Sequence, residues 1–275
     1  MVAQIQLRES FPMKHLHCIA LLLLLLLGCS QTEVPASKDA TLNVNTVAEE
    51  IMTATTDEGE DTAAPTPMLD SAEETAEVKA IEHWIPLFDG ESLAGWAMPV
   101  YGGDGIVDVQ KGILVIGRGD MMTGIRYEKE FPKINYEIRY EARRTEGYDF
   151  FASCTFPVKE SFCTFINGGW GGGLTGLSNV DGLDASENST GTYYGYRDNT
   201  WHRFRIRVVE DMVQVWITAQ DREGNWEEER TIIELETEDR KLSVRSEVNQ
   251  YKPLGFCTWS SEGQLRNIEY RMIER

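Results

Sequence analysis

Polar and apolar residues alternate with a period of two along most of the chain from residue 105 onward. In INYEIRYEARR, Tyr136, Ile138 and Tyr140 alternate with Glu137 and Arg139. This period is typical of a strand with one buried face. RFRIRVV repeats the pattern, and shorter apolar runs separated by turn residues surround it. No long helical stripe competes with the alternation, so the pattern predicts an all-β fold.

Strand number and spacing narrow this prediction to an architecture. Many short strands with turn residues at short intervals are typical of an antiparallel β-sandwich or jelly roll. All seven tryptophans lie in residues 81–275, a stretch long enough for one domain with its own core. We therefore predict a single β-domain over residues 81–275.

The N-terminal segment has the features of an export signal. Lys14 precedes an apolar run that is too short to span a bilayer comfortably. The run ends in Leu26-Leu27-Gly28-Cys29, which resembles a bacterial lipobox. We predict a signal peptide over residues 1–29, with Met13 as an alternative start, and a lipid on Cys29. The protein would be an exported bacterial lipoprotein, membrane-anchored in the periplasm or at the cell surface; an ordinary signal peptide or anchor is the alternative.

A strongly acidic segment follows this signal. Residues 31–80 contain twelve Asp or Glu and two Lys, which gives −10 of the net charge of −19. A segment of this composition cannot bury enough apolar surface to offset the entropy lost on ordering. We predict a disordered linker over residues 30–80, with an acidic interaction tail as the alternative. The lack of a basic stripe argues against a nucleic-acid partner.

A glycine-rich stretch, NGGWGGGLTG, begins at Asn167. It lacks the Gly-Lys-Ser/Thr of a phosphate loop, and no helix follows it as a dinucleotide fingerprint requires. Clustered glycines in strand context indicate bends or the close approach of a ligand to the backbone. Trp170, between these glycines, is a candidate platform for a sugar ring. The alternative is a tryptophan folded back onto the edge of the sandwich.

Oxygen-bearing side chains crowd the segment after this loop. Asp181, Asp184 and Asn188 could accept hydrogen bonds from sugar hydroxyls or bind a hard cation. The segment resembles only part of a calcium loop. Turn formation alone also explains these residue types. The sequence specifies no cofactor, and a divalent metal stays open as an alternative.

Three residues are candidates for proton transfer. His202 opens a predicted strand, without the spacing of a serine hydrolase elbow or of a zinc site. Glu146 and Asp149 lie at a strand junction beside aromatic residues, where burial would raise a carboxyl pKa. The alternatives are a structural histidine at a strand edge and acids that serve a turn.

Two further features have competing interpretations. Cys154 and Cys163 flank FPVKES, and a turn centred near Val158-Lys159 would place them opposite each other, as a disulfide or as two buried thiols. The charged residues of the alternating strands predict either cross-strand ion pairs or a polar sheet face that holds sugars. They are Arg139, Arg143, Arg203, Arg205, Arg207, Glu137 and Glu141.

The stretch from Trp84 to Trp96, WIPLFDGESLAGW, carries the most specific resemblance. It resembles the opening of the 3-keto-disaccharide hydrolase-like domains, also described as 3-keto-glycoside lyase/hydratase domains. VDVQKGILVIG, INYEIRYEARRTEGYDFF, DNTWHRFRIRV and LRNIEYR follow as similar segments in the same order. The resemblance implies a concanavalin A-like jelly roll over almost the whole domain.

The resemblance also implies cleavage of glycosides oxidised at C3. Such a site needs a base, for which Asp149, His202 and Glu146 are the candidates, and sugar contacts, for which Trp170, Asp181, Asp184 and Asn188 are the candidates. The departures are His202 where asparagine is usual and the glycine loop where relatives carry polar residues. We therefore expect a membrane-tethered hydrolase or lyase acting on a sugar derivative. A non-catalytic carbohydrate-binding lipoprotein is the main alternative, and a structural envelope protein is a third.

Overall fold

The computed structural model describes residues 83–274 of the chain. The predicted signal peptide, Cys29 and the linker of residues 30–80 lie outside the described residues. Within residues 83–274, no helix is long and apolar enough to cross a membrane.

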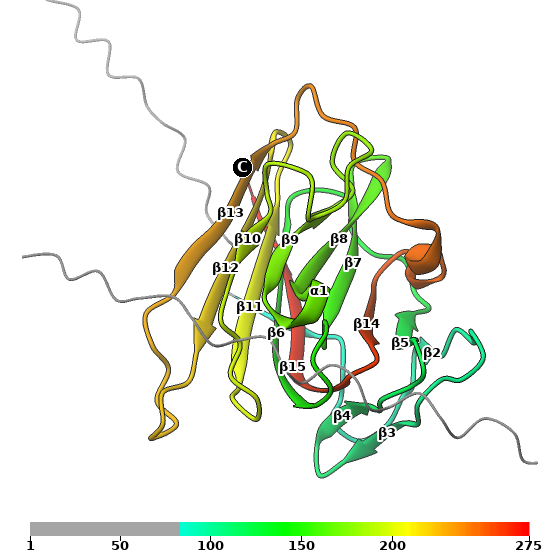
Figure 1. Cartoon of the computed structure of the whole chain (residues 1–275). Helices are drawn as coiled ribbons and strands as arrows, with labels where there is room; N and C mark the ends of the chain where they lie inside the picture. The colour runs from blue at the N-terminus through cyan, green and yellow to red at the C-terminus, as the bar shows by residue number, and fades with distance from the viewer. Residues whose placement is uncertain (1–82, 275) are drawn as a thin grey trace, which may run out of the picture. The chain divides into compact units, whose positions relative to one another are not determined.

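The described residues form two antiparallel sheets (Figure 1). In order across the first sheet, the strands are β13 (Arg230–Glu236), β12 (Met212–Ala219), β11 (His202–Val208), β6 (Tyr136–Glu146), β15 (Glu262–Met272), β4 (Ile113–Ile116) and β3 (Val107–Gln110), and β1 (Ile85–Pro86) pairs with β15. Across the second sheet they are β10 (Thr192–Tyr193), β9 (Leu174–Ser178), β8 (Ser161–Gly168), β7 (Ser153–Val158), β14 (Gly255–Trp259), β5 (Met122–Tyr127) and β2 (Trp96–Ala97). The prediction of an all-β jelly-roll sandwich is confirmed.

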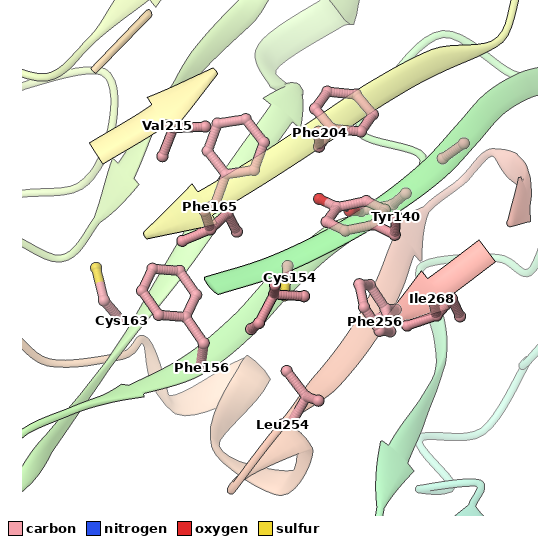
Figure 2. Packing of buried hydrophobic residues seen from close by; sticks show 14 of the residues in the cluster. Tyr140, Cys154, Phe156, Cys163, Phe165, Phe204, Val215, Leu254, Phe256 and Ile268 are labelled. Carbon is pink, nitrogen blue, oxygen red and sulfur yellow. The ribbon is translucent and has the colours of Figure 1, made fainter. Parts of the chain in front are cut away.

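The core lies between the sheets and is built from the apolar half of each alternation. The central strand β6 buries Tyr136, Ile138 and Tyr140 completely, as the period of two predicts. Aromatic rings from both sheets meet there, and Figure 2 shows them packed together with Ile268 and Leu254. Tyr140 and Phe204 of the first sheet stack with ring centroids 5.1 Å apart. This packing fixes which side chains of the second sheet point outward.

The outer face of the first sheet carries a charge network. Glu141 accepts hydrogen bonds from Arg203 and Arg266, at 2.8 Å in each case. Glu137 pairs in the same way with Arg205 and Arg271. Trp84, Trp201, Trp216 and Trp226 lie over the guanidinium groups of this face. The prediction of cross-strand ion pairs is confirmed.

The expected opposition of two cysteines is wrong. In the β7–β8 hairpin, Cys154 lies opposite Phe165 and Cys163 lies opposite Phe156. Val158 pairs with Ser161, so the turn is centred one residue later than expected, and the register moves by two residues. Both thiols are buried and free (Figure 2).

Candidate functional site

A cavity of about 310 Å³ opens on the outer face of the second sheet. Its floor includes Thr164 and Ile166 of β8 and Ser178 of β9. These side chains point outward because their neighbours Phe165 and Leu177 belong to the core between the sheets. The rest of the lining comes from loops and strand ends: Met122, Asp149, Phe150, Trp170, Asp184, Arg245, Glu247, Val248 and Trp259.

Trp170 enters this cavity from the glycine loop. The loop forms the single turn α1 (Gly169–Gly172), in which Trp170 has φ 50° and Gly171 has φ 89°. A bulky side chain rarely adopts the left-handed region, so the surrounding glycines and contacts hold Trp170 there against a local cost. Trp170 is 48% exposed and lines the cavity, which leaves its indole accessible to a ligand.

Asp149, in the connection between β6 and β7, fastens the glycine loop to this connection. Its Oδ2 accepts a hydrogen bond from the Gly171 amide at 3.1 Å, and its Oδ1 accepts one from the Phe150 amide at 2.8 Å. It forms no salt bridge with any residue that the structure describes. The carboxylate therefore has no ion-pair partner among the described residues, although the Arg144 guanidinium, which pairs with Asp198, lies 3.4 Å from the Asp149 backbone carbonyl oxygen.

Aromatic and apolar side chains form one wall. The rings of Phe150 and Trp259 lie 6.2 Å apart between centroids, and Met122 and Val248 extend the same surface. Together with Trp170, they give the cavity the mainly apolar lining that is common in small-molecule sites.

Another part of the cavity lining is charged, and there Arg245 pairs with two acids. Its guanidinium lies 3.1 Å from the Asp184 carboxylate and 3.0 Å from that of Glu247. The hydrogen bond from Arg245 lowers the pKa of Glu247 to about 2, so this group stays ionised. Glu247 lies in the first turn of the short 3₁₀ helix η1 (Ser246–Tyr251), which covers part of the second sheet. These three residues also line an adjoining hollow of about 270 Å³, which includes Glu187.

The structure brings together three of the predicted site residues: Asp149, Trp170 and Asp184 all line the cavity. Asp181 does not, because its carboxylate binds Arg240 at 2.8 Å and the Lys241 amide at 2.9 Å. Asn188 also lies elsewhere, and its amide group binds the backbone of its own loop, including Leu177 at 2.8 Å.

Glu146 faces a separate hollow. Its carboxylate lies 2.9 Å from Arg118, and both side chains are about half exposed. This hollow of about 750 Å³ shares no residue with the cavity beside Trp170. Glu146 therefore does not line the cavity that contains Asp149.

His202 lies in the core rather than in the cavity. It is 1% exposed, and its ring packs against Phe151, Tyr196 and Phe204. Burial lowers its pKa to about 4. Its Nδ1 has no hydrogen-bond partner in the described structure. We leave His202 out of the site because nothing places it beside a ligand in the cavity.

The donor groups of the cavity do not fit a divalent metal. Within the part of the chain that the structure describes, no three His, Cys, Asp or Glu side chains gather as metal ligands. Asp184 and Glu247 are held by Arg245, whose charge opposes a cation between them.

Phe150, Trp259, Arg245 and Glu247 are cavity residues that the sequence did not single out. Arg245 and Glu247 lie about a hundred residues from Asp149 along the chain, with no motif around them. Only the strand order of the second sheet, which places β14 beside β7, brings these segments to one face.

Residues 83–271 match the family model described as the 3-keto-alpha-glucoside-1,2-lyase-like domain. No curated protein matches the sequence.

Similar solved structures include a carbohydrate-binding module, the lumenal domain of VIP36 and a lectin. The carbohydrate-binding module CBM66 from Bacillus subtilis is 13% identical, covering 64% of this chain and 95% of its own, with a TM-score of 0.41. The lumenal domain of VIP36, bound to Ca2+ and Man3GlcNAc, is 10% identical over 70% of this chain and 91% of its own, with a TM-score of 0.46. Peanut lectin is 8% identical over 73% of this chain and 100% of its own, with a TM-score of 0.42. The match to the family model covers most of the sequence, so this chain belongs to the 3-keto-alpha-glucoside-1,2-lyase-like domain family.

Proposed function

We propose that the cavity on the second sheet binds one sugar unit of a carbohydrate. The observation that carries this proposal is that Trp170, Asp149 and Asp184 line a single cavity of about 310 Å³. This volume lies at the lower end of the range for small-molecule sites, about 300–1,000 Å³. The family description, a lyase-like domain for a glucoside, supports the same class of ligand.

The two kinds of wall match the two kinds of surface on a sugar ring. The apolar C–H groups of the ring would pack on the exposed Trp170 indole, with Phe150 and Trp259 beside it. The ring hydroxyls would donate to the carboxylates of Asp149 and Asp184. On the floor, the Thr164 hydroxyl is 2.9 Å from that of Thr155, so it keeps capacity for one further bond.

A second candidate function is catalysis, as a lyase or hydrolase of 3-keto-glycosides. The family description favours it. The Asp149 carboxylate also favours it, because this group lines the cavity and has no ion-pair partner among the described residues. In such a substrate the C3 ketone acidifies the C2 proton. Asp149 would remove this proton and later release it to solvent, and Arg245 would offer donors to the enolate oxygen. The C1 substituent would leave as its alcohol after taking a proton from solvent. Water would then add to the resulting double bond. Both Asp149 oxygens already accept backbone hydrogen bonds, so we place binding first.

We also propose that the domain is carried to the membrane by a lipid on Cys29. The lipobox-like sequence Leu26-Leu27-Gly28-Cys29 supports this proposal. Labelling cells that express the full chain with an alkyne fatty acid should tag the wild type and leave Cys29→Ala untagged. Equal labelling of both would refute the anchor.

Binding and turnover are tested in parallel on the wild-type domain. Calorimetric titration with methyl glucosides should give saturable binding that Trp170→Ala weakens. Incubation with 3-keto-glucosides, followed by release of the C1 substituent, tests catalysis. Turnover that Asp149→Asn abolishes would establish the lyase or hydrolase, whereas binding without turnover would establish a binding domain. If no sugar binds and no substrate turns over, the proposed function is wrong.

A further inference from the structure

The charges in the cavity do not balance. Three carboxylates, on Asp149, Asp184 and Glu247, line it against one guanidinium, on Arg245. Arg245 is engaged by both Asp184 and Glu247, so its charge is already shared between two acids. The adjoining hollow adds Glu187, and its other lining residues include no further cation. A ligand that enters this surface meets an excess of negative charge.

Asp149, the carboxylate without an ion-pair partner, is also the acid of the cavity that is closest in sequence to an aromatic residue. Asp149 precedes Phe150 directly, and its Oδ2 binds the amide next to Trp170 in sequence. Trp259 completes an aromatic wall with Phe150, at 6.2 Å between ring centroids. A carboxylate that forms no ion pair and lines the same cavity as indole and phenyl rings can bind an organic ammonium ion, through charge pairing and cation–π attraction.

We infer that the cavity selects a sugar that carries a protonated primary amine, and that it rejects sugars that carry a carboxylate. The amine would lie against Asp149 and the aromatic wall, while the ring hydroxyls face Asp184 and the floor of the second sheet. This inference rests on the proposed sugar site. An ammonium group held by Asp149 would block the carboxylate that elimination needs as its base. The inference therefore applies to the binding function and not to catalysis.

Four methyl glycosides of one ring geometry test the inference by calorimetry on the wild-type domain. These are the glucosaminide, its N-acetyl derivative, the glucoside and the glucuronide, titrated at a pH where the amine is protonated. We expect the glucosaminide to bind about tenfold more tightly than the glucoside, and the glucuronide to bind most weakly. The N-acetyl derivative keeps the nitrogen but loses the charge, so it should resemble the glucoside. Cyclohexylamine, an amine without hydroxyls, should bind more weakly than the glucosaminide.

Two further measurements distinguish a charge effect from a change in shape. Raising the salt concentration should reduce the preference for the glucosaminide and leave glucoside binding unchanged. Asp149→Asn, which removes the negative charge and keeps one oxygen acceptor for the loop, should bind the glucosaminide no more tightly than the glucoside. Equal affinity for the glucosaminide and the glucoside, or tightest binding of the glucuronide, would overturn the inference and leave the sugar site standing. Absence of binding by all four glycosides would overturn both.

Discussion

The Asp149 carboxylate accepts a hydrogen bond of 3.1 Å from the Gly171 amide, which ties the connection between β6 and β7 to the glycine loop. Through this bond, the residue that supplies the free negative charge of the cavity also fixes the turn that presents Trp170. Changes to the loop geometry should therefore affect binding even where no ligand-contacting side chain is altered.

Gly172→Ala tests this dependence. Gly172 has φ +112°, and a Cβ there would lie 2.8 Å from the Tyr148 carbonyl oxygen. The added methyl should displace the loop from Asp149 and weaken sugar binding about tenfold or more, with little effect on the core. Gly102→Ala is the matched control, since Gly102 has φ +87° with open space around it and lies outside the cavity. Equal binding by the two variants would show that the loop geometry does not matter.

The network on the first sheet makes Glu137 a stability determinant. Its buried carboxylate pairs with Arg205 at 2.9 Å and with Arg271 at 2.6 Å. Glu137→Ala should lower the free energy of unfolding by about 3 kcal/mol, because it leaves several guanidinium groups facing one another. Urea denaturation measures the change. Glu229→Ala, which removes a more exposed partner of Arg205, should cost less than about 1 kcal/mol. A comparable loss of unfolding free energy in both variants would contradict the claim that the buried Glu137 stabilises the domain more than the exposed Glu229.

The buried His202 should make stability fall in acid. Burial lowers its pKa from 6.5 to about 4, so the unfolded chain binds more protons than the folded chain between these values. Stability is therefore lost as the pH falls from about 6.5 to about 4, by up to about 3 kcal/mol.

Urea unfolding at a series of pH values checks this dependence. His202→Asn should flatten the slope between neutral and acid pH, while His83→Asn, which changes an exposed histidine, should leave it unchanged. An identical slope in the wild type and in His202→Asn would refute the assignment.

The three cysteines of the domain should react only after unfolding. Cys154, Cys163 and Cys257 are free and completely buried, and burial raises the pKa of the Cys163 thiol to about 12. Alkylation followed by peptide mass mapping should label them in denaturant and not in the native protein. A Cys154–Cys163 disulfide in the native peptide map would contradict the register of the β7–β8 hairpin.

The period of two predicted the fold because both sheets bury one face along their whole length. Tyr136, Ile138 and Tyr140 lie where the alternation places them. The hairpin register was missed because the apolar positions of β7 do not determine where a two-residue turn is centred.

The candidate site was predicted only in part, for a physical reason. Trp170 and Asp149 stand out in the sequence because glycines and a strand junction surround them. Arg245 and Glu247 lie in a loop without a motif and reach the cavity only through the strand order of the second sheet. His202 looked reactive as a residue type, but the strand pattern also placed it at the first inward position of β11, where it is buried.

A crystal structure of the domain with a bound methyl glycoside tests the central claim most directly. We expect the sugar ring to lie against the Trp170 indole, with a hydroxyl or amine within hydrogen-bond distance of Asp149. Trp170→Ala should weaken the affinity about tenfold, about 1.4 kcal/mol, while Tyr193→Ala, an exposed aromatic outside the cavity, should not. A sugar bound instead on the arginine and tryptophan face of the first sheet, with Trp170→Ala binding as the wild type does, would contradict the account.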